Sequence, residues 1–287
     1  MTLQRIIWLA SFPKSGNTWL RSFLAQYFMP DGKAPDINSL RDFTTADVRQ
    51  DFFDRAVGGR FVAADFDHWL RTRVKAVRLI AGSKSGHHFV KTHCQVQRIG
   101  PVDVIDPAVT AAAIYVLRNP FDVAPSYARH LGLSLDEAID KMLSPQSLNS
   151  TETRIFEIVG RWDDHVASWQ AARGLPQHVM RYEDMKADTE RAFRGLLGFL
   201  QAPVKDGKLR RAIRETSFDA LRKQEDSQGF VERPAGMEKF FAKGQSGAWR
   251  DDLTPGQVAR LREGFLPAIE RWYPELVEET ADVAAKA

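Results

Sequence analysis

The stretch IIWLASFPKSGNTWLRSFLAQYF (residues 6–28) decides the fold. Its apolar start, Ile6–Ser11, indicates a buried strand, and Thr18–Phe28 has the amphipathic periodicity of a helix. Between the two lies a short polar turn that contains Gly16. A helix N-terminus leaves backbone N–H groups unpaired, and its dipole favours an anion. The stretch therefore predicts a phosphate-binding turn between a strand and a helix.

The side chains of this turn fit the same role. Lys14 supplies a positive charge, and Gly16 lets the backbone approach a ligand closely. Three small side chains add hydrogen-bond donors: Ser15, Asn17 and Thr18. The turn is not a Walker A loop, because the Gly-x-x-x-x-Gly-Lys-Ser/Thr pattern is absent. The alternative is an ordinary strand–helix turn, with Ser15 as the N-cap and Trp19 in the core.

Strand and helix patterns alternate along the rest of the chain. Further apolar runs indicate buried strands at His88–Thr92, Ala113–Leu117 and Val179–Tyr182. Amphipathic patterns indicate helices at Asp65–Ile80, Phe121–His130, Thr151–Arg173, Thr189–Leu200 and Gln257–Trp272. This alternation predicts an α/β fold with a central parallel sheet, in a single domain over residues 1–287. We also expect a mobile flap at Pro30–Gly59, where periodicity is weak, and a frayed tail at Val277–Ala287.

Composition limits the function. The 287 residues are 44% hydrophobic and 27% charged, with a net charge of +3, which is too small for a nucleic-acid binder but permits a local basic pocket. The single cysteine, Cys94, excludes an intrachain disulfide and favours a reducing compartment, the cytoplasm. No apolar run approaches the roughly 18 residues of a membrane span. The short run after Arg5 is also too brief for a signal peptide.

A second group of residues follows the strand that ends at Leu117. Arg118 comes at its carboxyl end, where open α/β sheets bind ligands, and Ser126 lies eight residues further along the next helix. An arginine fork and a hydroxyl can hold a second phosphate. The alternative pairs Arg118 with Asp122 and leaves Ser126 on the helix surface.

Lys91 and His93 end another predicted strand, and alternation places them on the same side. A histidine there can serve as a general base, or it can be structural. Cys94 points to the other face and reads as a packing residue. Phe218, near Thr216, is a core residue or a stacking platform. The glycine-rich segment FFAKGQSGAWRDDLT, with Lys243 and Trp249, predicts a loop able to close over an anion.

Taken in order, these segments resemble the cytosolic-type sulfotransferase family, which uses 3′-phosphoadenosine-5′-phosphosulfate (PAPS) as its sulfuryl donor. FPKSGNTW resembles the family's 5′-phosphosulfate loop, and YVLRNPFDVAPSY its 3′-phosphate element. VKTH resembles the strand end with the catalytic histidine, RYEDM and TSF the adenine-contacting segments, and KGQSGAW the closing loop. The resemblance implies a P-loop-like three-layer α/β/α fold. It also implies a small-molecule hydroxyl acceptor, PAP as product and no metal.

The resemblance also implies a role for each matching residue. The 5′-phosphosulfate is held by Lys14, Ser15, Gly16, Asn17 and Thr18. The 3′-phosphate is held by Arg118, Ser126, Lys243 and Gly244. Trp19 and Phe218 sandwich the adenine, while Tyr182 and Thr216 bond to its edge. His93 is the general base and Lys91 helps to hold the sulfuryl group, so that the catalytic set is His93, Lys14, Lys91 and Ser126.

The chain departs from the family at four points. Ala242 stands where an arginine often precedes the Lys-Gly pair, so one 3′-phosphate contact is missing, or Arg233 or another nearby base supplies it. The Leu-Pro that commonly follows the histidine is absent. Pro255 falls where the family's dimerisation segment has a β-branched residue, so that dimer is not expected. The phosphosulfate loop also starts close to Met1, so we expect the N-terminal acceptor-binding segment of many relatives to be absent.

Two other functions remain open at this stage. A nucleotide-dependent phosphotransferase of the kinase type would need an acidic magnesium site and a Walker-type loop. A non-catalytic protein that binds PAPS or PAP would not need Lys14, Lys91 and His93. The acceptor is not specified: a phenol, a steroid-like alcohol, a sugar hydroxyl or a natural-product scaffold all fit. Its pocket is expected between Pro30–Gly86 and Leu131–Ser150.

Overall fold

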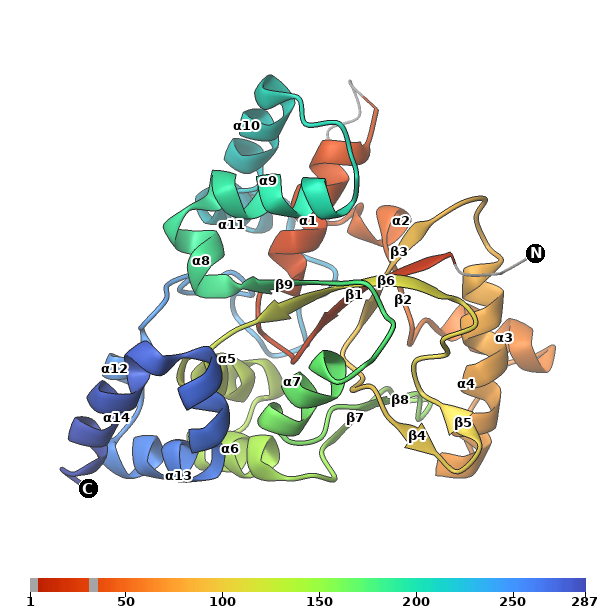
Figure 1. Ribbon diagram of the computed structural model, residues 1–287. Helices are drawn as coiled ribbons and strands as arrows, with labels where there is room; N and C mark the ends of the chain where they lie inside the picture. Colours follow the sequence, from red (N-terminus) through yellow and green to blue (C-terminus); the bar gives the residue numbers. More distant parts are fainter. Residues whose placement is uncertain (1–4, 31–35) are drawn as a thin grey trace.

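A five-stranded parallel sheet forms the centre of the protein in a computed structural model, which describes residues 5–30 and 36–287 (Figure 1). The strand order is β2-β3-β1-β6-β9. The strands are β1 (Ile6–Ser11), β2 (Thr45–Ala46), β3 (His88–Thr92), β6 (Thr110–Leu117) and β9 (Gln177–Arg181). β1 pairs with β3 on one side and with β6 on the other. The carboxyl ends of β3, β1 and β6 therefore meet at one edge of the sheet.

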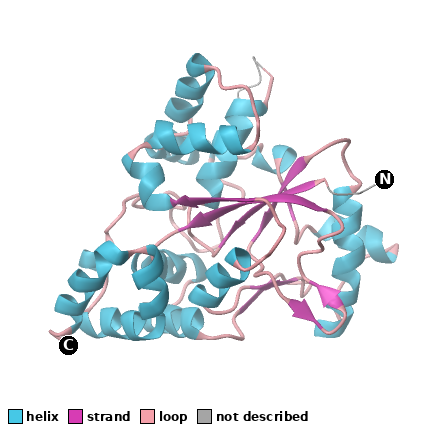
Figure 2. Cartoon of the chain, in the orientation of Figure 1, coloured by secondary structure: helices cyan, strands magenta, loops and turns pink. Residues whose placement is uncertain are grey.

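Helices cover both faces of this sheet (Figure 2). The N-terminal helices are α1 (Asn17–Phe28), α2 (Leu40–Phe43), α3 (Gln50–Val57) and α4 (Phe66–Ala81). The middle of the chain forms α5 (Pro120–Leu131), α6 (Leu135–Leu143), α7 (Trp162–Gln170), α8 (Tyr182–Ala187), α9 (Thr189–Phe199), α10 (Asp206–Glu215) and α11 (Phe218–Gln228). The C-terminal elements are α12 (Trp249–Asp252), α13 (Pro255–Trp272), η1 (Pro274–Leu276) and α14 (Val277–Ala284). Two small hairpins, β4–β5 (Arg98–Ile99, Val102–Asp103) and β7–β8 (Leu148–Ser150, Phe156–Ile158), complete the described chain.

Alternation along β1 produces two hydrophobic cores. Trp8 belongs to a large cluster with side chains of α4, α5, α7 and α13. Leu9, the next residue, belongs to a second cluster with α1, α9 and α10 on the opposite face. Because β1 is apolar on both faces, it must lie inside a three-layer α/β/α arrangement, as the sequence predicted.

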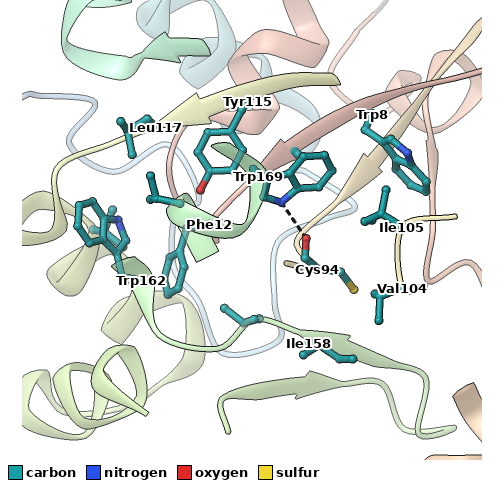
Figure 3. Close-up of a cluster of buried hydrophobic side chains, with 14 of the residues drawn as sticks. Trp8, Phe12, Cys94, Val104, Ile105, Tyr115, Leu117, Ile158, Trp162 and Trp169 are labelled. Carbon is teal, nitrogen blue, oxygen red and sulfur yellow. Dashed lines mark hydrogen bonds between the residues drawn. The ribbon is translucent and has the colours of Figure 1, made fainter. Parts of the chain in front are cut away.

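The large core fixes the end of β3 (Figure 3). Cys94 is fully buried there, and burial raises the pKa of its thiol to about 12. Its carbonyl accepts a hydrogen bond from the indole N–H of Trp169 at 3.1 Å. Cys94 is therefore a packing residue on the face away from His93, as expected. This hydrogen bond holds the backbone immediately after His93 in place.

A buried ion pair joins the segment after β2 to the same region. Arg73 of α4 contacts Asp47 at 2.6 Å, and both side chains are at most 1% exposed. The hydroxyl of Thr92, the last residue of β3, donates to the same carboxylate at 2.8 Å. A buried pair of this kind tolerates the loss of either partner poorly, because the other charge is left without compensation.

The structure corrects one expectation about secondary structure. The helix expected over Thr151–Arg173 is wrong in its first half, where β8 forms, and α7 starts only at Trp162. The C-terminal tail includes α14 over Val277–Ala284, with Thr280 buried, and its fraying stays a prediction. Part of the expected flap, residues 31–35, lies outside the described residues; the rest includes α2, β2 and α3, and its mobility stays a prediction. Across the described ranges, no helix has the length and apolarity that crossing a membrane requires.

Candidate active site

A cavity of about 960 Å³ opens at the carboxyl edge of the sheet. Its wall contains thirteen of the fifteen site residues expected from the sequence: Lys14, Gly16, Asn17, Thr18, Trp19, Lys91, His93, Arg118, Ser126, Tyr182, Phe218, Lys243 and Gly244. Among the described residues, the wall includes ten lysines and arginines against six aspartates and glutamates. Segments more than two hundred residues apart thus build one pocket suited to an anionic ligand.

The turn after β1 is shaped for close approach. Lys14 and Gly16 have left-handed backbones, with φ of +69° and +107°. A β-carbon placed on Gly16 would lie 2.7 Å from the ring of Tyr182, so only glycine fits without displacement. Gly16 itself is the N-cap of α1, and no side chain caps the helix, which corrects the alternative that gave this place to Ser15. The first-turn N–H groups of α1 thus receive no side-chain cap.

Two polar residues of the turn, Asn17 and Ser15, differ in their hydrogen bonds. The amide of Asn17 donates to the carbonyl of Leu9 at 2.9 Å and so ties α1 back to β1. The hydroxyl of Ser15 is buried without a partner among the described residues, and Ser15 does not line the cavity. Asn17 thus fixes the start of α1 against β1 and also lines the cavity together with Lys14.

The ammonium group of Lys14 is buried among other positive charges. It lies 3.8 Å from the ring centroid of Phe240, a cation–π contact. Burial, together with the nearby charges of Lys91 and Arg118, lowers the pKa of Lys14 to about 7. A bound anion would relieve this destabilisation, so Lys14 is poised to bind negative charge.

His93 has a defined tautomer. Its Nδ1 lies 2.8 Å from the backbone oxygen of Ser11 in β1. Because a carbonyl can only accept, Nδ1 must carry the proton, which leaves the lone pair on Nε2. Burial and the charge of Lys91 hold the pKa of His93 well below its usual range, so the ring is neutral near pH 7. The ring can therefore accept a proton at Nε2.

A buried network fixes the backbone of this histidine. Nε2 of His165 in α7 lies 3.2 Å from the carbonyl oxygen of His93. Nδ1 of the same ring lies 2.8 Å from the hydroxyl of Tyr115. The carbonyl requires a proton on Nε2 of His165, so the Tyr115 hydroxyl donates to Nδ1. Burial lowers the pKa of His165 to about 3, which agrees with a neutral ring. His93 is thus held by β1 through its side chain and by α7 through its peptide.

Arg118 joins three parts of the cavity. Its guanidinium donates to the carbonyls of Lys14 and Gln245, at 3.3 and 2.9 Å, and lies 4.3 Å from the ring centroid of Tyr182. Asp122 is 4.0 Å away, at the limit of an ion pair. The Asp122 carboxylate instead accepts from the N–H groups of Gly247 and Trp249, at 2.7 and 3.1 Å. Asp122 therefore anchors the glycine-rich loop to α5 and leaves Arg118 at the cavity.

Aromatic side chains and Gly244 form the remaining wall. Trp19 meets the ring of Tyr182 edge to face at 5.8 Å. A β-carbon on Gly244, whose φ is +60°, would lie 2.1 Å from the ring of Phe218. Thr216 does not line the cavity, since its buried hydroxyl donates to the carbonyl of Ala212 in α10. The expected contact of Thr216 with a ligand therefore has no support in this structure.

The comparisons with known proteins match this geometry. The profile of the sulfotransferase domain matches residues 4–273. The chain belongs to the sulfotransferase domain family. It is 26% identical over 269 residues to mouse sulfotransferase 1B1, covering 88% of this chain and 79% of that protein. It is 24% identical over 271 residues to cytosolic sulfotransferase 15 of Arabidopsis thaliana, covering 91% and 70%.

Solved sulfotransferases share the fold. A crystal structure of mouse sulfotransferase SULT7A1 complexed with PAP has a TM-score of 0.62 at 21% identity, covering 97% of this chain and 90% of that one. Retinol dehydratase in a complex with retinol and PAP has a TM-score of 0.64 at 17% identity, covering 94% and 82%. The P-loop-like α/β/α fold is therefore confirmed. Family membership makes the protein a PAPS-dependent sulfotransferase, with PAP as the product of the donor.

The sulfotransferase cavity fits a donor that carries phosphate groups. Besides its excess of cations, four buried polar atoms of its wall residues lack a hydrogen-bond partner in the described chain: Asn17 Oδ1, Trp19 Nε1, Arg118 Nε and His130 Nδ1. Unpaired buried polar atoms of this kind are costly unless a ligand or water satisfies them. Within residues 5–30 and 36–287, no cluster of three or more His, Cys, Asp or Glu side chains could hold a metal ion.

The sequence analysis named no role for several residues of the cavity wall: Arg21, Arg129, His130, Asn149, Glu157 and Glu232. Of these, Asn149 lies in Leu131–Ser150, a segment expected to line the acceptor pocket. His130 follows Ser126 by one helical turn of α5, so its position on the same face was readable from the spacing. Burial and the charge of Lys14 lower the pKa of His130 to about 3. Asn149 and Glu157 carry no motif signal, because they reach the cavity only through the β7–β8 pairing.

Proposed function

We propose that this sulfotransferase transfers the sulfuryl group of PAPS to a hydroxyl of a small-molecule acceptor, with His93 as general base. The observation that carries the proposal is the hydrogen bond from His93 Nδ1 to Ser11, which leaves Nε2 ready for a proton. His93 and Lys91 face one cavity with Lys14. As the acceptor oxygen forms its bond to sulfur, its proton passes to Nε2, and the bond between sulfur and the PAP phosphate breaks.

The remaining residues supply position and charge. Lys14 and the N-terminus of α1 stabilise the charge that develops on the leaving 5′-phosphate, because a preorganised cation acts most strongly in a site of low polarity. Arg118 and Ser126 hold the 3′-phosphate, and Trp19 and Phe218 enclose the adenine. This assignment follows the family resemblance and agrees with the placement of these side chains around one cavity.

The arginine that Ala242 replaces has a candidate substitute. Arg233 lines the cavity, but it donates to the carbonyl of Glu238 at 2.8 Å and lies 3.5 Å from the Glu225 carboxylate. Arg129 of α5 lies 3.7 Å from Asp252, a carboxylate that also pairs with Lys243. Arg129 is therefore the better placed base to supply the contact beside Lys243.

The departure from the family at Pro255 and the cysteine content also bear on oligomeric state and on cellular location. The Pro255 that departs from the family's dimerisation segment is the first residue of α13, capped by Thr254, so we propose no dimer of the family type. The single cysteine is consistent with a reducing compartment, and we place the enzyme in the cytoplasm. The chain is proposed to act as one domain without nucleic acid.

His93→Ala tests the general base. Turnover with PAPS should fall by about 10²–10⁴-fold, the usual worth of a positioned base, while the affinity for PAP measured by calorimetry should remain. The matched control is His178→Ala, because His178 stacks on Phe199 outside the cavity. A His93→Ala enzyme with normal turnover would show that another group removes the proton. Loss of PAP binding in that variant would assign His93 to binding instead.

A further inference from the structure

The β7–β8 hairpin lies beside the catalytic histidine. Asn149 and Glu157 are opposite each other in the register of this hairpin, and both line the cavity. The N–H of Gln95 donates to the carbonyl of Ile158 at 2.8 Å, which joins β8 to the chain two residues after His93. The two polar side chains therefore stand on the wall that continues from the proposed base, away from the phosphate-binding turn.

Each of these side chains has hydrogen-bonding capacity left for a ligand. The Tyr127 hydroxyl donates to Oδ1 of Asn149 at 2.9 Å, and the Asn149 side chain also hydrogen-bonds to the Glu157 carboxyl. An amide has two N–H donors and a carboxyl group accepts more than one hydrogen bond, so both side chains keep capacity for a ligand. The carboxyl group of Glu157 forms no salt bridge within the described part of the chain. Elsewhere on the wall, Glu232 pairs with Arg21 at 2.7 Å and Asp51 with Arg49 at 2.6 Å.

The surrounding charges narrow the class of ligand. Burial raises the pKa of the Glu157 carboxyl, and the closest opposing influence is the charge of Lys91. A cationic acceptor would face Lys91 and Lys14, and an anionic acceptor would face Glu157. A purely apolar acceptor would leave the remaining Asn149 N–H and the Glu157 carboxyl oxygens without a hydrogen bond to the ligand. A neutral molecule with adjacent hydroxyl groups satisfies the donor and the acceptor together.

We propose that Asn149 and Glu157 select a neutral, polyhydroxylated acceptor for the sulfuryl transfer. The reacting hydroxyl donates to His93 Nε2, and a neighbouring hydroxyl donates to Glu157 and accepts from Asn149. This inference rests on the proposed function and keeps its chemistry. The acceptor oxygen bonds to sulfur, the bond between sulfur and the PAP phosphate breaks, and His93 takes the proton. The hairpin adds only recognition, so its loss leaves the chemical step available to simple alcohols.

A matched pair of probes tests this selection. With PAPS, kcat/KM is measured for trans-1,2-cyclohexanediol and for cyclohexanol, and the diol value is halved for its two equivalent hydroxyls. The wild type should prefer the diol by about tenfold or more, because the second hydroxyl makes a hydrogen bond to a carboxyl group. Glu157→Met has a similar shape without an acceptor and should reduce the ratio to about one. Glu157→Gln keeps a neutral acceptor oxygen and should retain part of it.

The ratio separates the possible outcomes. Glu152→Gln changes an exposed carboxylate between β7 and β8 that does not line the cavity, so it serves as the control and should keep the wild-type ratio. Equal kcat/KM for the two probes, or a full preference in Glu157→Met, would overturn the inference while the sulfotransferase reaction stands. If neither probe is sulfated, NMR titration measures the dissociation constant of each probe from the enzyme–PAP complex. The ratio of these two constants then replaces the kcat/KM ratio and decides the question in the same way. That second measurement does not depend on turnover, so the two proposals fail separately.

Discussion

Gly16→Ala should destabilise the protein through two separable effects. The first is the left-handed backbone, with φ of +107°, which costs a residue other than glycine about 1–2 kcal/mol. The second is steric, because the new β-carbon would lie 2.7 and 3.2 Å from two ring carbons of Tyr182. Carbon atoms normally approach to about 3.5–4.0 Å, and overpacking of this kind costs about 1–3 kcal/mol. The expected loss of unfolding free energy is therefore about 2–5 kcal/mol.

Urea unfolding followed by tryptophan fluorescence measures this loss, and two variants divide it. Gly58→Ala has a left-handed φ of +73° but no atom within 4 Å of the new β-carbon, so only the backbone effect applies. In a Tyr182→Ala background, Gly16→Ala loses its steric partner and should cost no more than Gly58→Ala. The reasoning is refuted if Gly16→Ala and Gly58→Ala cost the same in the wild-type background. It is also refuted if removing the Tyr182 ring leaves the cost of Gly16→Ala unchanged.

Three further outcomes follow from the same structure. Below about pH 7, Lys14 is protonated both in the free enzyme and in the complex with an anion. Above about pH 7, Lys14 of the free enzyme loses its proton and must take it up again when an anion binds. PAP affinity should thus fall from pH 7 to 9 with proton uptake, seen by calorimetry in two buffers, and Lys14→Met should flatten the profile. The kcat/KM with PAPS should be at least ~10²-fold higher than with adenosine-5′-phosphosulfate, which lacks the 3′-phosphate. Arg118→Ala should abolish most of this preference. Equal kcat/KM for both donors in the wild type would contradict the 3′-phosphate site. Asp47→Asn should cost about 3–5 kcal/mol in urea, because Arg73 stays buried and charged, against at most about 1 kcal/mol for the exposed Asp51→Asn.

The sequence was sufficient for the part of the fold that carries the donor site. Short apolar runs define β1 and β3 with the observed bounds, because a strand buried on both faces leaves a clear local signal. The carboxyl ends of parallel strands then place Lys14, His93 and Arg118 at one edge of the sheet. These positions depend on strand order and direction alone, which the alternation of strands and helices already implies.

The acceptor side could not be predicted, since it depends on pairing between distant segments. The helical periodicity around residues 151–173 hid β8, which exists because it pairs with β7 and with the chain after β3. Gly160, with φ of +65°, ends this strand segment before α7, and the side chain of Gln95 fills the space beside it. Asn149 and Glu157 therefore enter the site through tertiary contacts. Thr216 is the opposite case, since its motif is present while its hydroxyl donates to the carbonyl of Ala212 in α10 and it does not line the cavity; its role stays a prediction.

The central claim is sulfuryl transfer from PAPS with His93 as base, and one experiment tests it most directly. The enzyme is incubated with PAPS and a hydroxyl acceptor in the presence of EDTA, and mass spectrometry quantifies sulfated acceptor and PAP together. We expect one PAP for each sulfated acceptor in the wild type, and both products reduced by at least about 10²-fold in His93→Ala. A phosphorylated acceptor, or sulfation that proceeds equally well in His93→Ala, would contradict this account.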